Sequence, residues 1–159
     1  MKSEPVQGRM TADGAGEVVV FLVGMRINNW WAVRSWLPVL RAMPPMIKEL
    51  ARNREWGMLG YRALGGLRNF GVLQYWESKE KLLAYAADQS GAHRPAWSAF
   101  NRRAREGRGG VGIWHETFVV REGSYENVYV DMPPSGLGAA RGVVPVGRRG
   151  ERAADRLGG

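Results

Sequence analysis

The segment that most constrains the fold is an apolar run near the N-terminus, from Val18 to Met25, which ends at Arg26. It is far shorter than the roughly 20 residues that a membrane-spanning helix needs, so it predicts a buried strand. Its bulky side chains alternate between the two faces of that strand: Val18, Val20 and Leu22 on one, and Val19, Phe21 and Val23 on the other. A strand that is apolar on both faces is buried on both. We therefore expect helices on one face of the sheet and a second subunit on the other.

The residues after this strand change to the spacing of a helix. Apolar side chains recur every three or four residues from about 30 to 52, whereas Arg34, Arg41 and Lys48 lie on the opposite side. Pro38 and the pair Pro44-Pro45 fall inside this pattern, so we expect the helix to be kinked or split, with one piece starting near Pro45.

The remaining elements complete a mixed α and β pattern. Residues 57–64 and 69–77 predict a hairpin, and Ser78 is placed to cap a helix over 79–87. A second helix is expected over 92–105, followed by strands over 111–121 and 125–130. This order, with one extra strand, predicts an α+β fold, the ferredoxin-like split βαβ arrangement with an antiparallel sheet.

Composition separates a folded core from two ends. Residues 1–16 predict a flexible N-terminal tail, 17–131 the folded domain, and 132–159, rich in Gly, Pro and Arg, a partly disordered extension. The net charge of +8 is concentrated in residues 94–108, with five arginines against one acid, and 141–159, with five against two. The first segment is the outer face of a predicted helix with the loop that follows it, and the second is a predicted tail. We therefore do not expect nucleic acid as a partner, and we expect the nearly neutral core to be the site of function.

Some kinds of site are excluded by residue counts. The chain has no cysteine, which excludes disulfides, iron–sulfur clusters and thiol nucleophiles. Only His93 and His115 are present, so a multi-histidine metal site within one chain is not expected. With no export signal and no membrane span, the expected location is the cytoplasm.

Five ordered stretches carry a family resemblance. They are residues 25–28 (MRIN), 36–44 (WLPVLRAMP), 74–78 (QYWES), 93–97 (HRPAW) and 111–117 (VGIWHET). Together they resemble the monooxygenase-like family DUF4188, over about residues 17–140. The resemblance implies a dimeric α+β barrel, in which two ferredoxin-like sheets pack face to face in a homodimer.

A broader resemblance concerns haem. Trp76-Glu77-Ser78, Tyr85 and Ala92-His93 occur in the order seen in haem-degrading dimeric α+β barrel proteins, whose histidine is the axial haem ligand. This resemblance implies haem as the cofactor, His93 as its metal ligand, and Trp97, Tyr85 and Trp76 as cofactor-binding side chains. Aldoxime dehydratases share the superfamily, so oxygen insertion and dehydration both stay open.

The same residues have simpler interpretations. His93 lies on the apolar face of its helix, where it is either a ligand or a hydrogen-bonded core histidine. In the strand over 111–121, either His115 or Glu116 points inward. Arg26 and Gln74 interrupt apolar strands; Arg26 either binds a ligand carboxylate or pairs with an acid such as Glu116.

We therefore predict a haem-dependent enzyme acting on a small, largely apolar organic molecule, with His115, Arg26 and Gln74 as catalytic or positioning groups. One alternative is a cofactor-independent monooxygenase of the same fold, in which the substrate itself activates oxygen. The other is a non-enzymatic ligand-binding or interaction module.

Overall fold

The computed structural model describes residues 4–88, 94, 98 and 109–158. Its elements in chain order are β1 (Val6–Ala12), β2 (Val18–Ile27), α1 (Val33–Arg52), a 3₁₀ turn η1 (Arg54–Trp56), β3 (Met58–Gly65), β4 (Asn69–Trp76), α2 (Lys79–Ala87), β5 (Val111–Val120), β6 (Tyr129–Met132), α4 (Gly136–Arg141), β7 (Val143–Pro145), a 3₁₀ turn η2 (Val146–Arg148) and α5 (Ala153–Arg156).

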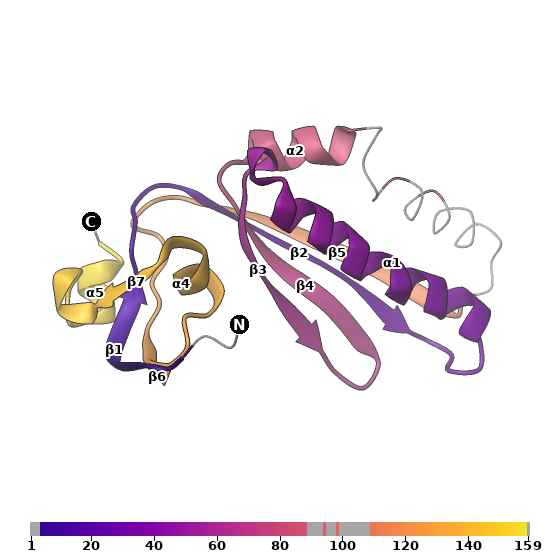
Figure 1. Ribbon diagram of the computed structural model, residues 1–159, viewed down its shortest axis with the longest axis horizontal. Coiled ribbons are helices and arrows are strands. Elements are labelled where there is room, and N and C mark those ends of the chain that lie inside the picture. The colour runs from indigo at the N-terminus through magenta and orange to yellow at the C-terminus, as the bar shows by residue number, and fades with distance from the viewer. Residues whose placement is uncertain (1–3, 89–93, 95–97, 99–108, 159) are drawn as a thin grey trace.

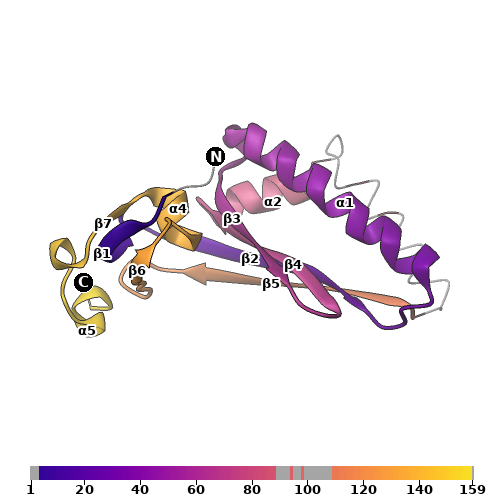
Figure 2. The same ribbon diagram turned by 60° about the horizontal axis from the view of Figure 1, so that its bottom comes forward.

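The main sheet has four strands in the order β3-β4-β2-β5, and every neighbouring pair is antiparallel. The two strands that follow helices in the sequence, β3 and β5, lie at the edges, as the split βαβ arrangement requires. Helices α1 and α2 cover one face of this sheet (Figures 1 and 2). The predicted α+β ferredoxin-like fold is confirmed.

The strand register decides which side chains face the helices. Phe21 of β2 lies between Gln74 of β4 and Thr117 of β5, and Val23 lies between Val72 and His115. Side chains paired across an antiparallel sheet share a face. The helix-covered face therefore carries the odd-numbered residues of β2 and β5 and the even-numbered residues of β4. Its core contains the buried residues Val19, Leu50, Met58, Trp76, Leu82 and Tyr85.

Helix α1 is one continuous helix, so of the expected kink or split at the prolines, the split is wrong. Pro44 and Pro45 are exposed, and the side chains of Ile47 and Leu50 are buried against the sheet. Carbonyl groups that lose their helical partner to a proline can be solvated on the outer face, while the buried face holds the helix together.

Helix α2 also follows its sequence signals. It covers the predicted residues, and the Ser78 side chain accepts a hydrogen bond from the Lys81 backbone N–H. The helix expected over 92–105 lies outside the described residues.

Both chain ends differ from the expectation of tails. Residues 6–12 form β1, the central strand of a second sheet with the order β6-β1-β7. Strand β6 begins at Tyr129 rather than 125 and joins this second sheet. Local patterning gave no sign of it, because its partners are more than 100 residues away in the sequence.

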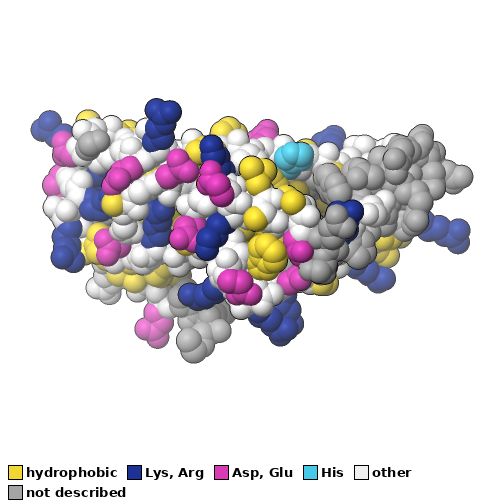
Figure 3. Space-filling model, turned by 90° about the horizontal axis from the view of Figure 1, so that it is seen from above, with side chains coloured by type: hydrophobic (Ala, Val, Ile, Leu, Met, Phe, Trp, Pro, Cys, Tyr) yellow, Lys and Arg dark blue, Asp and Glu magenta, His cyan; other side chains and the backbone are white. Residues whose placement is uncertain are grey.

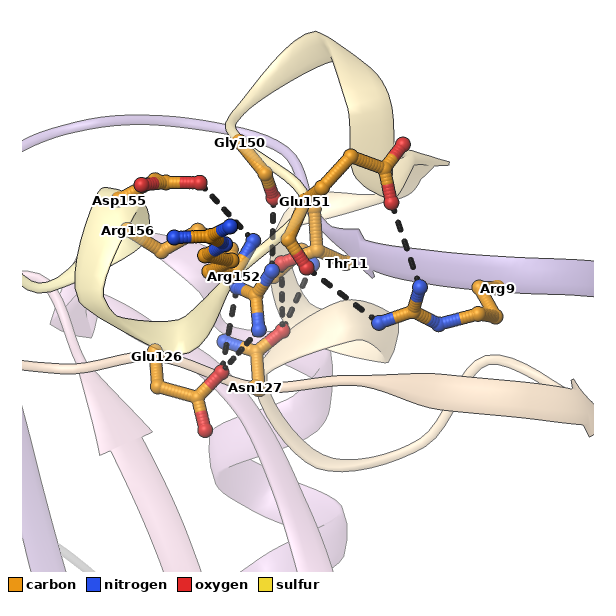
Figure 4. A network of polar contacts seen from close by, with 10 residues as sticks. Arg9, Thr11, Glu126, Asn127, Gly150, Glu151, Arg152, Asp155 and Arg156 are labelled. Carbon is orange, nitrogen blue, oxygen red and sulfur yellow. Dashed lines mark hydrogen bonds and ion pairs between the residues drawn. The ribbon is translucent and has the colours of Figure 1, made fainter.

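Polar side chains hold this second sheet together (Figure 4). Arg156 forms an ion pair with Glu126 at 2.8 Å and donates to the Gly150 carbonyl at 2.7 Å. Asn127 accepts from the Ala12 backbone N–H at 2.7 Å, and Arg9 pairs with Glu151 at 3.2 Å. Arginine in the C-terminal segment therefore fixes backbone that has few apolar side chains to bury.

The face of the main sheet that the helices leave open is apolar. Near one end α4 packs on it, where Leu137 contacts Val18 and Tyr75. Elsewhere on this face Val20, Leu22, Leu73 and Trp114 are half-buried and Phe118 is 51 % exposed. The expectation that β2 carries apolar side chains on both faces is confirmed.

Candidate functional site

A cavity of about 340 Å³ lies between the helix-covered face of the sheet and helices α1 and α2. Most of its lining is apolar, and among the described lining residues the polar or aromatic-hydroxyl side chains are Gln74, Tyr85, His115 and Thr117. This volume is within the range of small-molecule sites, which combine an apolar wall with a few polar groups. The cavity can therefore hold a small, largely apolar molecule and orient it by hydrogen bonds.

Helix α1 supplies an adaptable wall. Met43, Met46 and Ile47 of this helix line the cavity, and so does Val39, one turn earlier. Methionine side chains are unbranched and polarizable, so they can adjust to the shape of a bound molecule.

Gln74 is the buried polar group at the centre of the sheet face, with 4 % of its surface exposed. Its Oε1 accepts a hydrogen bond from Nε1 of Trp76 at 2.9 Å. An indole N–H can only donate, so this bond fixes the amide oxygen toward Trp76. The NH₂ group of Gln74 is then available as a hydrogen-bond donor to the cavity.

Tyr85 brings a phenol to the cavity from α2. Its ring packs against Trp56 and Trp76, with centroids 5.4 and 5.7 Å apart. Burial, together with the smaller effect of the negative charges of Glu49 and Asp88, raises the pKa of Tyr85 to about 12. The phenol is therefore protonated at neutral pH and can act as a hydrogen-bond donor, not as a base.

His115 lies at the exposed rim of the cavity on β5. Its ring centroid is 6.0 Å from that of Phe21, and its side chain is on the helix-covered face. The structure thus selects His115 over Glu116, which the register places on the open face opposite Leu22.

Arg26 does not belong to this cavity. It is an even-numbered residue of β2, exposed, and its cross-strand neighbours Asn69 and Gly112 lie on the open face. None of the salt bridges found among the described residues includes Arg26, so its expected pairing with Glu116 is not found there. Adjacent residues of a strand point to opposite faces, so Met25 is buried on the helix-covered face and Arg26 lies on the open face.

The predicted haem site has few supporting groups in the described part of the chain. His93 and Trp97 lie outside the described residues. No Lys or Arg is among the described residues that line the cavity, so nothing there would pair with haem propionates. Trp76 is fully buried and hydrogen-bonded to Gln74, which makes it a core residue rather than a stacking surface. The described side chains also contain no group of three or more potential metal ligands. Haem as the cofactor and His93 as its ligand therefore stay predictions.

Sequence reasoning missed Thr117 and the pairing of Trp76 with Gln74. Thr117 follows His115 in the alternation of β5, so that pattern contained the signal. The hydrogen bond between Trp76 and Gln74 could not be predicted, because it depends on side-chain directions that the sequence does not give.

Comparison with known families gives a match over most of the folded chain. The model of the Monooxygenase af470-like family matches residues 18–137, which run from the start of β2 into α4. The chain belongs to this family. Strand β1, strand β7 and α5 lie outside the matched region.

Among curated proteins, Monooxygenase af470 of Aspergillus fumigatus is 29% identical over 169 residues, covering 92% of this chain and 58% of that protein. The chain thus spans little more than half the length of its curated relative. Similar solved structures include a dimeric ferredoxin-like protein of unknown function from Jannaschia sp., with 20% identity, a TM-score of 0.43, and coverage of 62% of this chain and 97% of that one. Another is a conserved protein of unknown function from Bacteroides thetaiotaomicron, with 13% identity, a TM-score of 0.43, and coverage of 65% and 97%.

Proposed function

We propose that this protein is a monooxygenase that binds a small, largely apolar organic molecule in the cavity between sheet and helices and oxidises it without a bound cofactor. The observation that supports this most is the composition of the cavity: an apolar chamber with one buried amide, one protonated phenol and one imidazole at its rim. Membership of a family named for a monooxygenase supports an oxidation as the class of reaction.

The proposed roles follow from the position of each side chain. The NH₂ group of Gln74, oriented by Trp76, donates a hydrogen bond to an oxygen of the substrate. Tyr85, kept protonated by burial, is a second donor deeper in the cavity. His115 at the rim is the proposed general base, because an imidazole nitrogen can accept a proton from the substrate.

The oxidation itself requires a substrate that can be made electron-rich. Loss of a C–H proton to His115 leaves a carbanion whose charge is delocalised onto the oxygen that Gln74 contacts. That anion transfers one electron to O₂, the resulting substrate radical and superoxide combine to form the C–O bond, and protonation of the peroxide gives a C–O–O–H group. Loss of water from this hydroperoxide leaves a carbonyl, so R₂CH₂ and O₂ become R₂C=O and H₂O. The substrate supplies all the electrons.

We further propose that two copies pair through their open sheet faces. The half-buried apolar side chains there, including Leu22, Leu73 and Trp114, form an apolar surface on the face of the described sheet opposite α1 and α2. Burying such a surface removes apolar area from water, which is the dominant driving force for stable association. The proposed partner is therefore another copy of this chain.

The test is oxygen consumption by the purified protein with a panel of enolisable and phenolic aromatic compounds. We expect uptake of ¹⁸O₂ into product, without any added cofactor and with no visible absorbance from the protein. A His115→Gln variant should lower kcat about 10²- to 10⁴-fold, the usual contribution of a general base. Gln74→Leu should weaken substrate binding as well, because it removes the donor inside the cavity.

Reconstitution with hemin separates this proposal from the haem-dependent prediction. If activity appears only after hemin is added, and a Soret band is lost in His93→Ala, the cofactor-independent reaction is wrong. Binding of panel compounds without any oxygen consumption would favour a non-enzymatic binding module instead.

A further inference from the structure

We propose that the end of the molecule opposite the chain termini is a docking surface for anionic phospholipid membranes. Three segments meet at this end (Figures 1 and 2): the β2–α1 loop, the β3–β4 turn and the start of β5. The backbone N–H of Ile27 donates to the Arg68 carbonyl at 2.8 Å, and that of Asn28 to the Gly110 carbonyl at 3.1 Å. These bonds hold the three segments side by side.

The most exposed large apolar side chains of the described chain gather here. Trp31 is 93 % exposed and Leu67 is 84 % exposed, the two highest values, and Trp30 and Val33 are more than one third exposed. We call these four residues the loop-end patch. Isolated exposed apolar residues are ordinary on protein surfaces, but the two most exposed ones on adjacent loops are not.

The loop that carries Trp31 is ordered by its own bonds. The Asn29 side chain accepts from the Trp31 backbone N–H at 3.0 Å, and the Trp36 indole donates to the Trp30 carbonyl at 3.1 Å. Trp30 and Trp36 also meet edge to face, with centroids 5.8 Å apart. The fold therefore fixes the backbone of this loop and still leaves the Trp31 side chain in solvent.

Among the described residues, the charge around the loop-end patch has one sign. Arg26, Arg34 and Arg68 flank it, whereas the sequence has no Asp or Glu from 18 to 48, from 57 to 76, or from 109 to 115. On the face seen in Figure 3, acidic side chains lie over the left and middle of the molecule, and the coloured side chains at the right-hand end are basic or hydrophobic. This part of the described surface therefore has no carboxylate that would repel an anionic partner.

Exposed tryptophan and leucine surrounded by arginine is the combination that suits the interface of an anionic bilayer. Tryptophan favours the headgroup level, and each basic residue near the surface adds electrostatic attraction to anionic lipid. No described helix is long and apolar enough to span a bilayer, so the contact is with the surface. The inference does not depend on the proposed reaction.

The test is sedimentation of the full chain with vesicles of phosphatidylcholine alone or with 30 mol % phosphatidylserine, in low and in high salt. We expect binding to the anionic vesicles, weakened by salt, together with a blue shift of tryptophan fluorescence. The double variant Trp31→Ser/Leu67→Ser should lower the partition coefficient at least tenfold. Arg34→Gln should lower it about fivefold, the effect of one surface charge.

The matched controls lie at the other end of the molecule. Leu157 is 46 % exposed and Arg148, in η2 directly after β7, is also exposed, so Leu157→Ser and Arg148→Gln remove the same kinds of side chain there. They should leave binding unchanged. The proposal is overturned if anionic vesicles do not bind the protein, or if the control variants weaken binding as much as the patch variants do. A change of mass in solution caused by Trp31→Ser/Leu67→Ser would overturn it in favour of contact between copies.

Discussion

Gln74 and Trp76 lie two residues apart on β4, and their hydrogen bond joins two side chains that are almost completely buried. A buried polar group left without its partner costs about 1–3 kcal/mol, more than the net gain from making the bond. The pair therefore has two functions. It satisfies both groups within an apolar core, and it decides which end of the amide faces the cavity.

Replacing either partner alone should destabilise the protein. We expect Trp76→Phe and Gln74→Leu each to lower the free energy of unfolding by about 1–3 kcal/mol, because each leaves one buried group unsatisfied. The double variant should lose about 1 kcal/mol less free energy of unfolding than the two single variants lose together. Urea unfolding of the four proteins measures this, and strictly additive losses would show that the two side chains do not interact.

Tyr85 gives the stability of the fold a dependence on alkaline pH. Its pKa is about 12 in the folded protein and near 10 in the unfolded chain, so between these values the unfolded chain has lost a proton that the folded protein keeps. Stability is unaffected by this group below pH 10 and falls as the pH rises from 10 to 12, by at most about 1.4 kcal/mol per pH unit. Chemical unfolding across this range should show a shallower decline in Tyr85→Phe; an identical decline in both proteins would contradict the burial of the phenol.

The elements of the chain are held by two different kinds of interaction. In the main sheet, apolar faces of β2, β4, α1 and α2 pack together around Trp76 and Leu50. In the second sheet, arginines bind backbone carbonyls far away in the sequence, as Arg141 does with Ala15 and Glu17. Much of the positive charge near the C-terminus is therefore structural. Its role is to order Gly-rich backbone, not to form a free basic tail.

Deleting residues 142–159 should unfold one sheet and spare the other. The deletion removes β7, the backbone bond from Asp13 to the Gly142 carbonyl, and the bonds from Arg149 to the carbonyls of residues 12 and 14. We expect amide hydrogen exchange in β1 to become fast, while β2 and β4 stay protected. Exchange followed by mass spectrometry tests this; equal loss of protection in β4 would mean that the two sheets unfold as one unit.

At the scale of the whole molecule, the main sheet has one face covered by helices and one face that is apolar and mostly open. Phe118 and Trp114 on β5 belong to the open face, and Val20 and Leu22 lie beside them on β2. The cavity is on the opposite side, under α1 and α2. Association of two copies through the open face would therefore leave each cavity intact.

A charge on the open face should prevent this association. Phe118 is 51 % exposed, so Phe118→Glu changes the surface without disturbing the core, and we expect it to convert dimer to monomer. Tyr61, 48 % exposed, lies on the opposite face of the same sheet at its edge, and Tyr61→Glu is the matched control. Light scattering during size-exclusion chromatography gives the mass; a monomeric wild type, or a dimer that survives Phe118→Glu, would contradict the proposed interface.

The sequence by itself determined the main sheet and its helices. Period-two and period-3.6 patterns report which local face is apolar, so β2, the β3–β4 hairpin, α2 and β5 were predictable, and with them the order that defines the fold. The same patterns placed Gln74 and His115 on apolar strands. Both of these residues line the cavity.

Only the tertiary structure decided which polar residues share a site. Strand register put His115 with Gln74 and put Arg26 and Glu116 on the other face, because adjacent residues of a strand point in opposite directions. The second sheet was likewise invisible in the sequence. Its strands are short and its bonds join residues such as Thr11 and Asn127 that are 116 positions apart, so no local period records them.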